Sequence, residues 1–169
     1  MPTRSEVLTL GRRLHNALRH AVEDSENYRS GAVARADFEH YACSMYLAGT
    51  LAFLEGKYGT QPWKASASRL SLNAFLAEPG DKRREGLQKA GVSEAGLRAL
   101  VCIRNAVVHN DGDLSKNTDK RSEATVQAAK LPGVTISGSM VHLASCPDTD
   151  FMEYVRKAFV AVSMQHGDL

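Results

Sequence analysis

The sequence predicts an all-α fold, an antiparallel bundle of four to five helices with a minor β-hairpin before the C-terminal helix. Three observations lead to this prediction. Apolar residues recur at i, i+3 and i+4 in several long segments, which is the spacing of one face of a helix. Short breaks that contain Gly or Pro separate these segments, and short connections favour antiparallel neighbours. One stretch alternates apolar and polar residues on both sides of Ser-Gly-Ser, which is typical of a hairpin.

The composition is that of one globular domain, which we expect to cover residues 1–169. The chain is 43% hydrophobic and 24% charged, and its net charge of +2 is too small to indicate nucleic acid by itself. No apolar run approaches the roughly 18 residues of a membrane span, and we recognise no signal peptide. Cys43, Cys102 and Cys146 lack the spacing of metal ligands. We therefore expect a cytoplasmic protein with reduced thiols, no cofactor and no metal.

Three helices are expected in the first half of the chain, over residues 5–27, 33–58 and a shorter stretch that ends near residue 77. The middle helix is apolar on most of its circumference. One stripe contains Phe38, Tyr41, Met45, Ala48 and Ala52, and the other contains Leu47, Leu51, Leu54 and Tyr58. Such a helix is buried on more than one side, in the centre of a bundle or in a bundle that also dimerises. We expect its polar exceptions, His40 and Glu55, on the surface.

Basic residues occur in two segments, one before and one after a further helix that is expected between Ser93 and Gly112. The first is the run Lys82, Arg83 and Arg84, and the second is a polar stretch, residues 113–121, that carries Lys116 and Lys120. Basic runs are usually solvated, but these five are the best candidates for contact with phosphates. We expect residues 113–121 to form a mobile loop, because they are short of apolar residues. The hairpin follows at residues 134–143, and the last helix begins near residue 150.

Between the two basic segments, one helix carries the sequence Arg104-Asn105-Ala-Val-Val-His109. Ser93 is its expected N-cap and Gly112 its expected C-cap. Its apolar residues Leu97, Leu100, Val101 and Val108 form the buried stripe of a helix. Arg104 lies in the middle of this stripe, although a charge on an apolar face is unfavourable unless it is paired or faces a wet cleft. Asn105 and His109 are i, i+4 neighbours at the stripe's edge.

Each of these residues also has a simpler interpretation. An Arg in an apolar stripe often extends its guanidinium to water, and a His in a last turn often caps the helix. What favours a site is their combination within one and a half turns.

The Arg-Asn-x-x-x-His motif, followed by Asn-Asp-Gly inside a helical context, resembles the signature of the HEPN domain superfamily. The resemblance implies a helical bundle, usually a homodimer with both motifs at the interface. It also implies metal-independent endoribonuclease activity by Arg104, Asn105 and His109 of both chains, leaving a 2′,3′-cyclic phosphate. A toxin or phage-defence role, with an antitoxin or other partner protein, would fit such an enzyme.

The chain departs from one HEPN subgroup. Many toxins that are paired with a minimal nucleotidyltransferase have a Tyr two residues after the His, where this chain has Asp111. Two alternatives remain open. In the first, the protein is an inactive HEPN-like module that binds RNA or dimerises and regulates a partner. In the second, it is a helical interaction protein in which the motif occurs by chance.

Overall fold

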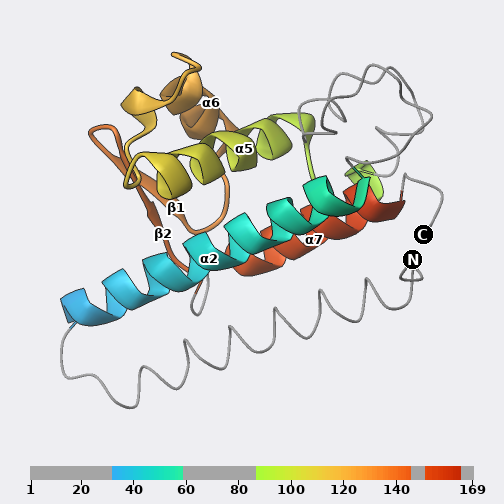
Figure 1. Cartoon of the computed structure of the whole chain (residues 1–169), viewed down its shortest axis with the longest axis horizontal. Coiled ribbons are helices and arrows are strands. Elements are labelled where there is room, and N and C mark those ends of the chain that lie inside the picture. The colour runs from blue at the N-terminus through green and yellow to red at the C-terminus, as the bar shows by residue number, and fades with distance from the viewer. Residues whose placement is uncertain (1–31, 59–86, 146–150, 165–169) are drawn as a thin grey trace.

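The computed structural model describes residues 32–58, 87–145 and 151–164 of the chain (Figure 1). Side chains are described for residues 36–51, 87–145 and 151–161. The helices expected over residues 5–27 and up to residue 77 lie outside the described residues, and so does the basic run Lys82, Arg83 and Arg84.

The described residues are mostly helical, with one small antiparallel sheet before the last helix, as the sequence predicted. The helices are α2 (Ala32–Tyr58), α5 (Glu94–His109), α6 (Ser122–Ala129) and α7 (Phe151–Met164), with a 3₁₀ helix η1 (Leu114–Lys116). The sheet is the hairpin of β1 (Val134–Ser137) and β2 (Met140–Leu143), in which Val134 pairs with Leu143 and Ser137 with Met140. None of the described helices is long and apolar enough to cross a membrane.

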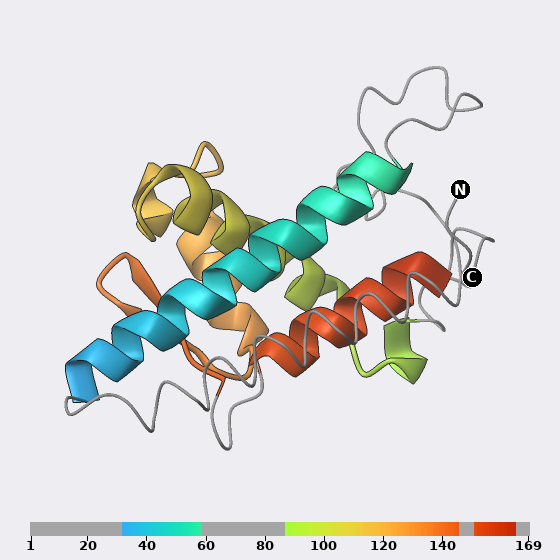
Figure 2. The same cartoon turned by 60° about the horizontal axis from the view of Figure 1, so that its bottom comes forward.

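Helix α2 packs against both α5 and α7 (Figures 1 and 2). In both views α7 lies beside α2 and runs in the same direction, whereas α5 runs roughly opposite to α2. Helix α6 and the 3₁₀ helix pack on α5, and β2 contacts both α2 and α5. The core lies among these elements and is formed by side chains such as Leu47, Leu97, Ile103, Phe151 and Met152, each at most 1% exposed.

Only one side of α2 is buried among its described side chains. Cys43, Tyr46 and Leu47 face the core, whereas Tyr41 is 67% exposed and Met45 is 71% exposed. Within the single chain the stripe with Tyr41 and Met45 is therefore not buried, and its burial in a dimer stays a prediction. The described elements that contact α2 pack on its other side. Periodicity therefore identified an apolar face of the helix but not whether another element packs against that face.

Two polar side chains of α2 hold the hairpin. The buried Glu39 carboxylate accepts a hydrogen bond from the Ser145 backbone N–H, and His40 Nδ1 accepts one from the Leu143 N–H at 3.1 Å. His40 is therefore half-buried and not a surface residue as expected. Burial lowers the pKa of His40, nearby His142 lowers it further, and Asp37 acts in the opposite direction. The accepting Nδ1 is consistent with a neutral imidazole.

The stretch after α5 is also ordered by contacts, which contradicts the expected mobile loop at residues 113–121. Asp113 caps η1, because its Oδ1 accepts hydrogen bonds from the Ser115 N–H at 3.0 Å and the Ser115 hydroxyl at 2.7 Å. Hydrogen bonds from the side chains of Ser115 and Ser139 hold the pKa of Asp113 at about 2. Leu114 and Asn117 are buried, at 1% and 3% exposed. The composition of the segment gave no sign of this order, because only two residues, Leu114 and Asn117, attach it to the core and they form no periodic pattern.

Candidate active site

Helix α5 begins as the sequence predicted. Ser93 is the N-cap, and its hydroxyl accepts a hydrogen bond from the Gly96 N–H at 3.0 Å. Glu94 follows in the first turn, where a carboxylate favours the helix dipole. The Tyr154 hydroxyl of α7 lies over Gly96 so closely that a Cβ at this position would overlap it. Burial raises the pKa of Tyr154, and hydrogen bonding to Ser93 lowers it to a smaller extent.

The apolar stripe of α5 is buried for its first part and then leaves the core. Leu97, Leu100 and Val101 are buried, as predicted. One turn later Arg104 is half-buried, and Val108 is 47% exposed, so the expectation that Val108 is buried is wrong. The last turn of α5 therefore presents the end of an apolar stripe on the surface.

The three candidate catalytic residues lie on this partly open end of α5. Arg104 and Asn105 are half-buried, the Nε atom of Arg104 is buried, and His109 is exposed as the last residue of the helix. At about 100° per residue, the three directions span about 140° of the helix circumference, and Val108 lies between them. The structure thus places a guanidinium, an amide and an imidazole on one face, around an exposed valine.

The C-cap of α5 is Asn110 and not Gly112, which corrects the predicted C-cap. The Ala106 carbonyl accepts hydrogen bonds from the Asn110 N–H at 2.9 Å and the Gly112 N–H at 3.0 Å. Between them, Asp111 has a φ of +52°, and Gly112 has a φ of +86°. Gly112 still marks the turn, since its left-handed backbone favours glycine.

The turn is joined directly to the hairpin. The Val141 N–H donates to the Gly112 carbonyl at 3.0 Å, and the Leu114 N–H donates to the Ser139 carbonyl at 2.9 Å. Residues 112–114 thus run along the free edge of β2, so the segment after the motif is held by the backbone of a distant element.

A buried amide that sequence reasoning missed also contacts this region. Asn117 Nδ2 donates to the Cys102 carbonyl at 2.9 Å, and Asn117 Oδ1 accepts from Asn110 Nδ2 at 2.8 Å. No local signal marks Asn117 in the sequence, because a polar residue in a polar stretch looks solvated until its tertiary partners are known.

The described basic candidates lie on the connection between α5 and α6. Lys116 has a side chain that is 64% exposed and a Nζ 3.6 Å from Asp113 Oδ2, and Lys120 and Arg121 are exposed. Because η1 and α6 both pack on α5, these cations belong to the same part of the molecule as the motif helix.

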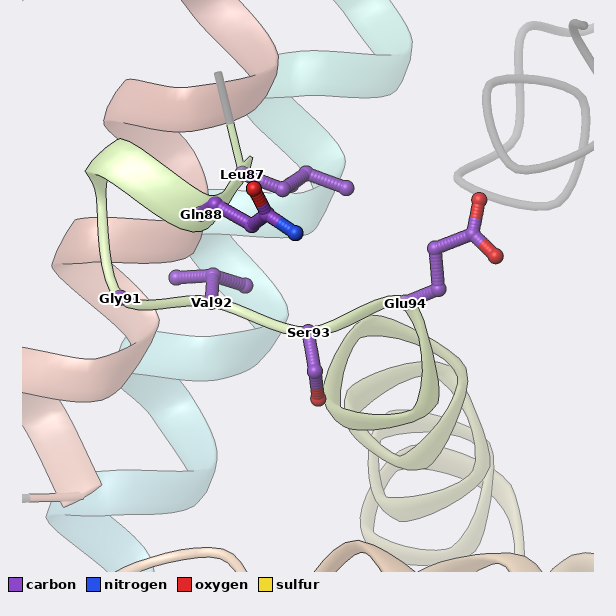
Figure 3. Close-up of a pocket in the computed structure, with 6 residues that line it drawn as sticks. All are labelled: Leu87, Gln88, Gly91, Val92, Ser93 and Glu94. Atoms are coloured by element: carbon purple, nitrogen blue, oxygen red, sulfur yellow. The ribbon is translucent and has the colours of Figure 1, made fainter. Parts of the chain in front are cut away.

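A pocket of about 450 Å³ lies at the other end of α5 (Figure 3). Leu87, Gln88 and Gly91 to Glu94 line it, so it contains none of the three candidate catalytic residues. Leu87 and Val92 are themselves buried, at 2% and 3% exposed, and provide its apolar wall.

No group of three or more His, Cys, Asp or Glu residues within the described ranges is arranged to hold a metal ion. Of the described cysteines, Cys43 and Cys102 are buried and neither is in a disulfide, and burial raises the pKa of the Cys102 thiol.

Comparisons of the chain with protein-family models, with curated proteins and with solved structures found no match.

Proposed function

We propose that the protein is a HEPN-like, metal-independent endoribonuclease whose composite site forms in a homodimer. The single observation that carries this proposal is the emergence of the α5 stripe from the core at Arg104 and Val108. The half-buried Arg104 and the 47% exposed Val108 occupy positions where the same stripe, two turns earlier, is fully covered. A face of this kind, with Asn105 and His109 beside it, fits a surface that a second copy covers.

The chemistry of the three side chains fits RNA cleavage by transfer within the substrate. The ribose 2′-oxygen attacks the adjacent phosphorus, a base takes its proton, and the bond from phosphorus to the 5′-oxygen breaks as an acid protonates that oxygen. The products are a 2′,3′-cyclic phosphate and a free 5′-hydroxyl. Imidazole is suited to both proton transfers, and a guanidinium stabilises the negative charge that develops on the phosphate oxygens.

A homodimer supplies what one chain lacks. The described part of one chain carries a single His109 at the open end of α5, whereas the reaction uses both a base and an acid. A two-fold axis near Val108 would bring two copies of Arg104, Asn105 and His109 together, one His for each role. A bundle of four to five helices, in which α2 and α7 run parallel and α5 runs roughly opposite to them, and the toxin or defence role with a partner protein belong to this same proposal. So does a cytoplasmic location.

The decisive experiment compares wild-type protein with His109→Ala in the cleavage of a mixed RNA pool with EDTA present. Because His109 is exposed, the substitution removes a proton carrier and little packing. We expect cleavage to fall about a hundred- to ten-thousand-fold while RNA affinity and Tm stay near the wild-type values. New 3′ ends should carry cyclic phosphate, and sedimentation should give twice the chain mass.

The matched control is His142→Ala, the same substitution at another exposed histidine, which lies on β2 outside the three-residue motif and the basic segments. A wild-type protein that binds RNA without cutting it, with equal binding by His109→Ala, would replace the enzyme by the inactive RNA-binding module. A clean monomer at micromolar concentration would reject the composite site.

A further inference from the structure

Asn117 contacts α5 on both sides of the motif. Its side chain, in a residue only 3% exposed, reaches the carbonyl of Cys102 and the side chain of Asn110. Cys102 precedes Arg104 by two residues, and Asn110 directly follows His109. The segment that contains all three candidate catalytic residues thus lies between two hydrogen bonds made by one amide.

The orientation of this amide is determined by its partners. A backbone carbonyl can only accept a hydrogen bond, so the nitrogen of Asn117 must face Cys102. Its oxygen then faces Asn110, which must donate through its own nitrogen. The contact with the Cys102 carbonyl is buried, so losing the amide leaves that carbonyl without this donor away from water, whereas the contact with Asn110 is part-buried.

Asn110 connects this amide to the turn that ends α5. It is the C-cap residue, and its backbone N–H shares the Ala106 carbonyl with the N–H of Gly112. The direction of the exposed His109 depends on how firmly this turn is held, because helix ends fray unless their last groups are bonded.

We propose that Asn117 is a positioning residue of the candidate site, which fixes the last two turns of α5 and with them the directions of Arg104 and His109. Its effect on cleavage rests on the function proposed above. Its effect on the turn does not, because that effect is a property of the folded chain alone. The two parts are therefore tested by separate measurements.

The first measurement is hydrogen exchange at the backbone N–H groups of Asn110 and Gly112, in wild type, Asn117→Ala and Ser145→Ala. Ser145 is the matched control, because it is also 3% exposed and its hydroxyl accepts one hydrogen bond, from the Met152 N–H at 3.2 Å. We expect exchange at both sites to rise about three- to tenfold in Asn117→Ala and to stay unchanged in Ser145→Ala. Equal acceleration in the two variants overturns the proposal, whether or not the protein cleaves RNA.

The second measurement separates kcat from KM for RNA cleavage. We expect Asn117→Ala to lower kcat about tenfold or more while KM stays within about twofold, since RNA-contacting residues are untouched. Asn110→Ala, at a half-buried position that tolerates truncation better, should show a smaller loss of the same kind. The kcat of the double variant should be no lower than that of Asn117→Ala alone, because Asn110 acts through the same hydrogen bond with Asn117.

The outcomes distinguish the two proposals. Faster exchange with wild-type kcat would overturn the positioning role while leaving the enzyme in place. Wild-type protein that never cuts RNA would reject the proposed function, and the role of Asn117 in catalysis with it. Faster exchange, lower kcat and unchanged KM together would support both.

Discussion

A glycine at the start of α5 offers a sharp test of the fold. A Cβ at Gly96 would overlap the Tyr154 hydroxyl and would lie 2.9 Å from the ring carbon that carries it. Tyr154 is hydrogen-bonded to Ser93, so Gly96→Ala must displace the ring from α5 and break this bond. Overpacking costs about 1–3 kcal/mol and a lost hydrogen bond about 0.5–1.5 kcal/mol. The better helix propensity of alanine offsets about 1 kcal/mol of this.

We therefore expect Gly96→Ala to lower the free energy of unfolding by about 2 kcal/mol. In a chain of this size the change corresponds to a decrease in Tm of about 4–8 °C. The assay is urea unfolding followed by circular dichroism. Tyr154→Phe removes the oxygen that the new methyl group meets, so the same substitution in that background should be less destabilising by about 1 kcal/mol or more.

The control is Gly49→Ala. Gly49 lies in α2, and a Cβ there would have no atom within 4 Å. We expect this change to stabilise the protein by up to about 1 kcal/mol through helix propensity alone. The packing of Tyr154 on Gly96 would be refuted by either of two results. One is that Gly96→Ala lowers the free energy of unfolding no more than Gly49→Ala does. The other is that Gly96→Ala lowers it equally with and without Tyr154→Phe.

Three further changes have outcomes that the structure specifies. Gly133 and Gly138 have similar φ values of +69° and +62°, but of the two only Gly133 has a position where a Cβ would meet a backbone carbonyl. Unfolding experiments should therefore show that Gly133→Ala is about 2 kcal/mol less stable than Gly138→Ala. The folded-state pKa of Asp113 lies below its ordinary value of 3.8, so its carboxylate stabilises the fold at neutral pH and this stabilisation is lost as the pH falls towards about 2. Asp113→Asn should therefore be less stable than wild type at pH 7, and the difference in urea midpoint should close over that pH range. Lys116 and Lys120 are changed together to Glu in the third test. If both side chains contact phosphates, the slope of log affinity for single-stranded RNA against log salt concentration should become shallower by about 1.4. An unchanged slope would show that the two lysines lie outside the RNA interface.

The parts of the fold that sequence analysis predicted well are those governed by neighbours in the chain. The Ser93 cap, the extent of α5 and the two strands of the hairpin follow from local patterns, and the structure has them close to where they were expected. The errors share a different cause. Tyr41 and Val108 continue apolar stripes, yet both are exposed, because a stripe is buried only where another element happens to cover it.

The candidate site divides in the same way. Arg104, Asn105 and His109 were found from a motif, which is local information, and the structure places them on one face of α5. Asn117 was missed, because its two partners are seven and fifteen residues away along the chain and come together only in the folded protein. A polar residue acquires this kind of role from tertiary structure, and composition gives no sign of it.

The left-handed backbone of Asp111 has an evolutionary consequence. Asp is one of the few residue types that adopt such a φ readily, whereas a bulky aromatic residue there is strained by roughly 1–2 kcal/mol. Two residues after the His is also the position at which the HEPN subgroup described above has a Tyr, where this chain has Asp111. Under the function proposed above, a single Asp111→Tyr change would thus place a strained residue at this position, because the turn keeps its left-handed backbone. The backbone of the turn after α5 thus limits which side chains the chain can carry two residues after His109.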